Sequence, residues 1–259
     1  MNHFVSRALL LALAFATAGA QAQDSRDYYL FQRSALPQAL HVDFESATGT
    51  RDAGAFGRHG MEGLVRSGWT AAEHWTLEAS GSVAENRDTD EHGGAWSAEA
   101  RYGWSAEDAE WGLGVGGGYR RSYDGVSIPY LRLVGERALQ RWHFAMNGVV
   151  ELPQSAERDS TDVLISLGSS YTLSAALRLG FELAGEDLEG LFASDEAEGG
   201  AKFVFGPTLA WRSGETTALR VHLGWIHALT ANAPTNPGAA DYRAHRDGLL
   251  ARLSLSFAR

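Results

Sequence analysis

The sequence lacks several features that define whole classes of protein. It has no cysteine, which excludes disulfide bonds, zinc–thiolate sites and thiol nucleophiles. Basic residues are outnumbered 22 to 32 by acidic ones, and the net charge of −10 argues against nucleic-acid binding, which requires a basic surface. Beyond residue 22 no run approaches 18 consecutive apolar residues, which excludes a conventional transmembrane helix.

The overall composition is that of a folded chain. Hydrophobic residues make up 44% and aromatic residues 10% of the 259 positions, which is too apolar for a disordered polymer. The length suits one large domain or two small ones. The 30 glycines follow no collagen period and therefore indicate turns, bulges or close packing.

Residues 1–22 have the order of features expected of a secretory signal peptide. Arg7 supplies a positive charge, Leu9 to Phe15 form a short apolar run, and Ala20 and Ala22 are small residues at a cleavage site. We predict cleavage after Ala22 and export of the mature chain. The alternative is a buried N-terminal helix.

From Ala39 onward the dominant signal is an alternation of apolar and polar residues. In Trp75–Val83 every odd residue is apolar or small and every even residue is polar. Successive side chains of a strand point to opposite faces, so one face of this segment is apolar and the other is polar. The pattern recurs about twelve times, in runs of roughly nine to twelve residues, the length that a tilted membrane strand needs.

The segments between these runs alternate between short and long. Residues 70–74 are an example of a short connector, and residues 85–94 and 185–200 are examples of long ones. Short turns at one end and longer loops at the other are typical of transmembrane β-barrels, which must close because lipid cannot satisfy a free strand edge. Aromatic residues suited to the membrane interfaces lie near the strand ends: Trp69, Trp75, Trp96, Trp104, Trp111, Tyr171, Trp211 and Trp225.

In these respects residues 39–258 resemble bacterial outer-membrane β-barrel proteins. The final run, Leu249 to Phe257, resembles the assembly signal of that class, although Ala258 and Arg259 follow it. The resemblance implies an all-β fold: an antiparallel transmembrane barrel of about 12 strands over residues 39–259, preceded by a short periplasmic segment, residues 23–38. It also implies the outer membrane of a Gram-negative cell, with membrane lipid, lipopolysaccharide and the barrel-assembly machinery as partners. A soluble periplasmic β-sandwich or barrel is the alternative.

The polar parity predicts which charged side chains line the lumen. Both signs are present, so no single-sign ladder steers one kind of solute. The predicted lumen residues are Glu62, Arg66, Glu78, Glu99, Arg101, His143, Glu151, Arg178, Glu182, Lys202, Arg212, Arg220, His222 and Arg252.

Two functions follow from a charged lumen. A hydrated lumen predicts a small porin-like channel or transport protein for small polar solutes. If arginine–carboxylate pairs fill it instead, the protein is a closed structural or binding barrel whose loops dock a partner. Its acidic outer loop could then hold a divalent cation through carboxylates, which suit hard cations, although the spacing is not that of an EF-hand. The carboxylates concerned are Asp187, Glu189, Asp195, Glu196 and Glu198.

A third function, a loop-based hydrolase, rests on one short motif. Asp88, Asp90 and His92 could together activate a water molecule if a rigid loop held them. No histidine is followed at the second position by serine, the pair found in outer-membrane phospholipases. We therefore predict a non-enzymatic protein, and nothing in the sequence predicts a cofactor.

Overall fold

The computed structural model describes most of the chain from Leu40 onward. The described residues are 40–49, 60–86, 91–105, 111–123, 125–155, 161–186, 188–191, 201–214, 216–229 and 247–258. The predicted signal peptide, the segment 23–38 and most of the acidic loop lie outside these ranges.

The described residues form twelve β-strands and one short 3-10 helix, η1 (Leu188–Leu191). The strands are β1 (Leu40–Gly49), β2 (Gly60–Ala72), β3 (Trp75–Asn86), β4 (Glu91–Ser105), β5 (Trp111–Arg121), β6 (Ser127–Leu139), β7 (Trp142–Glu151), β8 (Asp162–Thr172), β9 (Leu177–Glu186), β10 (Lys202–Ser213), β11 (Thr217–Ala228) and β12 (Gly248–Ala258). In the part of the chain that the structure describes, no helix is long and apolar enough to cross a membrane.

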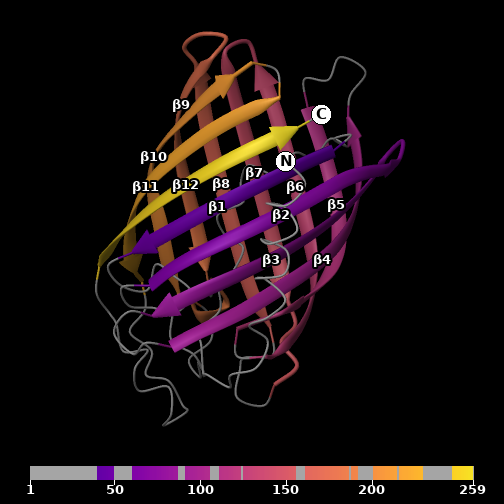
Figure 1. Cartoon of the computed structure of the whole chain (residues 1–259), viewed down its shortest axis with the longest axis vertical. Helices are drawn as coiled ribbons and strands as arrows, with labels where there is room; N and C mark the ends of the chain where they lie inside the picture. Colours follow the sequence, from indigo (N-terminus) through magenta and orange to yellow (C-terminus); the bar gives the residue numbers. More distant parts are fainter. Residues whose placement is uncertain are drawn as a thin grey trace, which may run out of the picture.

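Each strand pairs antiparallel with its sequence neighbours, and β1 pairs with β12 to close the sheet into a barrel (Figure 1). At this seam Val42 lies opposite Phe257 and Gly49 lies opposite Leu250. Closure gives every strand two hydrogen-bonded neighbours and leaves no free edge. The predicted twelve-strand antiparallel barrel is confirmed.

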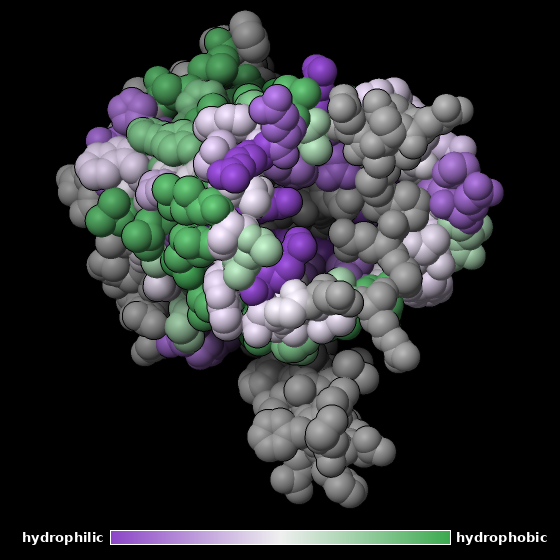
Figure 2. Space-filling model, turned by 90° about the horizontal axis from the view of Figure 1, so that it is seen from above, coloured by the Kyte–Doolittle hydropathy of each residue, from purple (hydrophilic) through white to green (hydrophobic). Residues whose placement is uncertain are grey.

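Alternating side chains explain why these strands form a barrel with two chemically distinct surfaces. In β3, Trp75 is 45% exposed on the outside, whereas Thr76 and Glu78 are buried on the inside. The same alternation places leucine, valine, phenylalanine and tryptophan side chains around the outer wall. Figure 2 shows apolar side chains on the flank and hydrophilic side chains around a central hollow. The arrangement suits lipid outside and polar contacts inside.

The connectors divide the barrel into two different ends. At the end where β1 begins and β12 ends, the strands are joined by residues 73–74, 106–110, 140–141, 173–176 and 214–216. We call this the short-turn end. The opposite, long-loop end includes the connectors 50–59, 152–161, 187–201 and 229–247. Six of the eight predicted interface aromatics lie near the short-turn end, whereas Trp96 and Trp225 lie toward the other.

Two boundaries differ from the sequence-based expectation. The connector between β3 and β4 is residues 87–90 rather than the expected 85–94, because the two strands pair as far as Asn86 and Glu91. Ala175 shares the odd apolar parity of Leu177 and Leu179, which favours a strand, but it lies in the turn before Leu177. In both regions the alternation alone does not mark where pairing stops.

Candidate functional site

The lumen is the candidate functional site because charged side chains from every part of the barrel converge there. Strand register and burial place all fourteen predicted lumen residues on the inward face. Most are buried, whereas His143, Arg178, Lys202 and Arg220 are partly exposed and Arg212 is exposed. The inward face therefore combines a buried ionic centre with more accessible cations near its ends.

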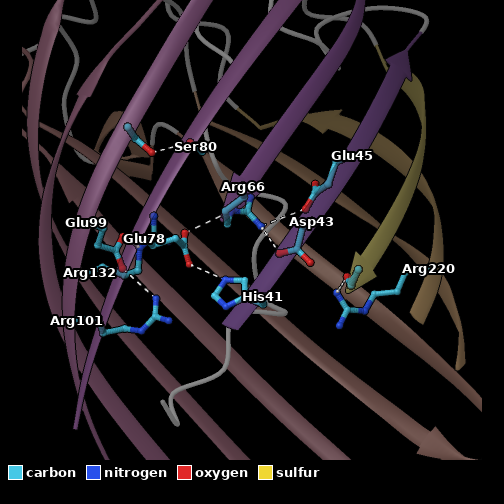
Figure 3. Close-up of polar contacts among 12 residues, drawn as sticks. His41, Asp43, Glu45, Arg66, Glu78, Ser80, Glu99, Arg101, Arg132 and Arg220 are labelled. Carbon is cyan, nitrogen blue, oxygen red and sulfur yellow. Dashed lines mark hydrogen bonds and ion pairs between the residues drawn. The ribbon is translucent and has the colours of Figure 1, made fainter. Parts of the chain in front are cut away.

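The first ionic group is centred on Arg66 of β2 and joins the first three strands (Figure 3). Arg66 Nη1 lies 3.2 Å from Glu45 Oε1 and 3.5 Å from Asp43 Oδ2, both on β1. Arg66 Nε lies 3.4 Å from Glu78 Oε1 on β3, and the other oxygen of Glu78 is 3.4 Å from His41 Nε2. One guanidinium thus links three carboxylates, and arginine suits this role because it offers five donors in a plane.

The Arg66 group continues across the β1–β12 seam. Arg252 of β12 places Nε 3.2 Å from Glu45 Oε2 and Nη1 3.7 Å from Glu182 Oε1 on β9. His222 of β11 lies with Nδ1 3.8 Å from the second oxygen of Glu182. These contacts connect six strands of the barrel through side chains inside the lumen.

A second group is centred on Glu99 of β4. Its two oxygens lie 3.0 Å from Arg101 Nη1 and 2.7 Å from Arg132 Nε. Arg132 of β6 also donates to Asn147 Oδ1 at 2.9 Å, and Asn147 Nδ2 donates to Ser166 Oγ at 3.4 Å. The group spans β4 to β8 and gives the buried carboxylate two cationic partners, which offsets part of the cost of removing it from water.

Toward the long-loop end, separate polar pairs and a layer of apolar side chains replace the connected ionic groups. Arg120 Nη2 lies 2.7 Å from Glu151 Oε2, and the Tyr123 hydroxyl lies 2.9 Å from Glu62 Oε1. Lys202 Nζ lies 3.2 Å from Glu186 Oε2. A layer of apolar inward side chains, one from each of β6 to β12 and one from β1, packs at this end: Tyr130, Val149, Leu164, Ala184, Val204, Ile226, Leu250 and Ala47.

Three arginines near the short-turn end differ from the rest. Arg178, Arg212 and Arg220 lie on β9, β10 and β11, and none of them forms an ion pair with a carboxylate of the described residues. Arg220 donates instead to Ser256 Oγ at 3.2 Å. At the same end His143 Nε2 lies 3.5 Å from Glu136 Oε2. The positive charge of the three arginines is therefore not neutralised by direct contact within the described ranges.

Sequence reasoning missed several inward residues that complete these groups. Arg132 was hidden because Pro129 and the adjacent Leu131 and Leu133 obscured the phase of β6, which the register with β5 and β7 now fixes. Asp43 and Glu45 lie in a run whose alternation was visible, so parity could have found them. Tyr123 follows β5 in a connector, where no strand rule applies.

The other predicted sites receive no metal or hydrolase geometry from the described residues. His92 lies in β4, paired with Glu85, rather than in the loop where it was expected; Asp88 and Asp90 lie outside the described residues. Asp187, Asp195, Glu196, Glu198 and the side chain of Glu189 also lie outside them. Among the described residues, no group of three or more histidine, aspartate and glutamate side chains is arranged to hold a metal ion.

Comparisons with known proteins place this architecture among bacterial outer-membrane porins. No family model and no curated protein matches the sequence. Among solved structures, the chain is similar to the KdgM porin in complex with disordered oligogalacturonate, with a TM-score of 0.57 and 10% identity, covering 85% of this chain and 99% of that one.

Two further structures show the same likeness. The NanC porin gives a TM-score of 0.58 at 12% identity and covers 84% of this chain and 100% of its own. An outer-membrane channel from Pseudomonas putida F1 gives 0.58 at 13% identity, covering 90% and 99%. The chain therefore has the fold of bacterial outer-membrane β-barrel porins.

Proposed function

We propose that the protein is an outer-membrane channel that passes small polar solutes and has no enzymatic activity. The observation that carries the proposal is the closed twelve-strand barrel with an apolar outer wall and an inner wall bearing both signs of charge. An apolar band outside and polar groups inside are the requirements of a protein that conducts through lipid. Export through residues 1–22 and contact with membrane lipid, lipopolysaccharide and the assembly machinery belong to the same proposal.

A comparison supports a solute path, whereas the inward glycines of β5 do not open one by themselves. A Cβ at Gly116 would lie 3.1 Å from Arg101 Cβ, and a Cβ at Gly118 would meet the Tyr130 ring, so neighbouring side chains already occupy this space. The similar KdgM porin was solved in complex with oligogalacturonate, which supports the idea that a barrel of this fold accepts a solute. Because the lumen carries both signs, we propose small polar solutes in general as its cargo.

The absence of cysteine permits a sharp test with single Ser→Cys variants. Ser80 faces the lumen and its Oγ lies 2.7 Å from Ser97 Oγ, whereas Ser169 of β8 has the outward parity. In planar bilayers we expect stepwise conductance from the unmodified protein. A charged methanethiosulfonate reagent should then reduce the current of Ser80→Cys by roughly half, because the adduct occupies the path.

Ser169→Cys is the matched control, since it carries the same reagent on the outer wall and should keep its conductance. Heat-modifiable migration on a gel verifies that both variants are folded. Absence of current steps from folded protein would reject the channel. If the reagent reduced the current of both variants equally, the ions would not pass through the lumen beside Ser80.

A closed structural or binding barrel is the second candidate function. It is favoured by the contact of Arg252 with Glu182 across β12 and β9 and by the apolar layer near the long-loop end, because both occupy the lumen. In this case the acidic loop, including Asp187 and Glu189, would dock a partner or divalent cation. Folded, inserted protein without conductance is the result expected of this alternative.

A further inference from the structure

We propose that Arg178, Arg212 and Arg220 form an anion-binding site at the short-turn end of the lumen, for a small solute bearing carboxylate or phosphate groups. The inference rests on the proposed channel function and deepens it by locating where such a solute binds. It concerns one sector of the wall, β9 to β11, and not the compensated ionic groups at the centre of the barrel.

The strand register brings the three arginines together. Ala210 of β10 lies opposite Arg178 on one side and opposite Arg220 on the other, and Arg212 is two residues further along the same face of β10. Neighbouring strands lie about 4.8 Å apart, so the Cα atoms of Arg178 and Arg220 are about 10 Å apart. The small side chain of Ala210 leaves the space between them to the guanidinium groups and a bound anion.

The charges of this sector are not balanced locally. Arg66, Arg101, Arg120, Arg132 and Arg252 each lie within 4 Å of a carboxylate oxygen. Arg178 and Arg212 have no carboxylate within ion-pair distance among the described residues. Their two positive charges are close enough to repel each other. Like charges held together at partly exposed positions repel each other, and an anion placed between them relieves that repulsion.

Arg220 lies between the pair Arg178 and Arg212 and the carboxylates of β1 at the barrel centre. Asp43 and Glu45 attract it at longer range, and within the described ranges its guanidinium donates a hydrogen bond to Ser256 Oγ. Figure 3 shows its guanidinium on the β12 side, apart from the Arg66 group. A guanidinium has five N–H donors, so the contact with Ser256 leaves donors for a bound ligand.

A buried hydroxyl provides an independent indication of a ligand. Ser254 of β12 lies directly opposite Arg220, faces inward and is 2% exposed. Its Oγ has no hydrogen-bond partner among the described residues. Buried polar groups are usually satisfied, so this hydroxyl is available to donate to an anion held by Arg220.

The chemistry selects the class of ligand. Guanidinium groups bind carboxylate and phosphate through paired, charge-assisted hydrogen bonds, and a serine hydroxyl adds a neutral donor. The site opens toward the short-turn end, where Arg212 is exposed. A small di-anion places a separate negative charge near each of two guanidinium groups, which a single carboxylate does not do.

The experiment measures binding separately from conduction. Titration calorimetry at low ionic strength uses the full chain, refolded in neutral detergent, with inorganic phosphate in one arm and succinate in the other. We expect the double variant Arg178→Gln/Arg212→Gln to bind about tenfold more weakly or worse, because charge-assisted hydrogen bonds are roughly twice as strong as neutral ones. Arg141→Gln, which removes one positive charge from an exposed turn at the same end, should bind as the parent does.

A second readout follows the selectivity of the open channel. Under a KCl gradient in planar bilayers, the reversal potential of the double variant should shift toward cation selectivity, and that of Arg141→Gln should not. Unchanged affinity in the double variant, or no binding of either anion by the parent, would overturn the inference. Conductance without anion binding would leave the channel function standing, whereas binding without conductance would support the site and reject the channel.

Discussion

Gly206→Ala is expected to prevent most of the chain from reaching the closed barrel. A Cβ at Gly206 would overlap the carbonyl oxygen of Leu223 and lie 2.8 Å from its carbonyl carbon. Both are backbone atoms of the neighbouring β11, so relief requires the two strands to separate. Overpacking usually costs about 1–3 kcal/mol and more when the backbone must move. The folded fraction after refolding, read as the heat-modifiable band, measures the loss.

Gly148→Ala is the matched control for this variant. Gly148 lies in β7, and no atom of the described structure is within 4 Å of the position a Cβ would take. Its folded yield should equal that of the parent. A normal yield for Gly206→Ala would show that β10 and β11 do not approach as closely as the structure has them.

Arg132→Met is expected to lower the free energy of unfolding by about 3–5 kcal/mol, the usual effect of breaking a buried ion pair. The Arg132 side chain is 1% exposed and that of Glu99 is 2% exposed, with Nε and Oε2 2.7 Å apart. Removing the guanidinium also deprives Asn147 of a donor. Glu99 keeps Arg101 as its partner, which sets the loss toward the lower end of the range. Urea unfolding followed by tryptophan fluorescence in detergent measures the change.

The double variant Glu99→Gln/Arg132→Met separates the missing contact from the unpaired charge. Neutralising Glu99 removes the buried carboxylate that the single variant leaves under-compensated, so the double variant should recover part of the stability. Strictly additive losses in the double-mutant cycle would indicate that the two side chains do not interact. Arg141→Gln again serves as a surface control with no expected change.

The fold could be predicted because the barrel imposes a period that short stretches of sequence display. Trp75–Val83 alternates without interruption, and each such run adds one strand. The boundary between β3 and β4 could not be placed, because polar residues near 85–94 suit a loop and a strand end equally well. Pairing between Glu85 and His92 is a property of two strands together, and neither strand reveals it alone.

The composition of the lumen was accessible from parity, but its contacts were not. Alternation shows that Arg66 and Glu78 share a face, while the contact between them depends on strand register and side-chain conformation. Arg132 was missed because leucines flank it on both sides in β6, where the lipid face and a proline obscure the period. The neutralised centre and the unneutralised arginines of β9 to β11 are distinguished only by which carboxylates lie nearby.

The seam between β1 and β12 constrains how the barrel is made. Its partners, such as His41 and Ala258, lie at opposite ends of the described chain, and the contact between Arg252 and Glu45 crosses it inside the lumen. Until β12 has been synthesised, β1 has no second partner, and a truncated sheet would carry two reactive edges. Contacts so distant in sequence form slowly. Closure therefore needs the last strand, and we expect a chain shortened by one strand to aggregate rather than to assemble into a smaller barrel.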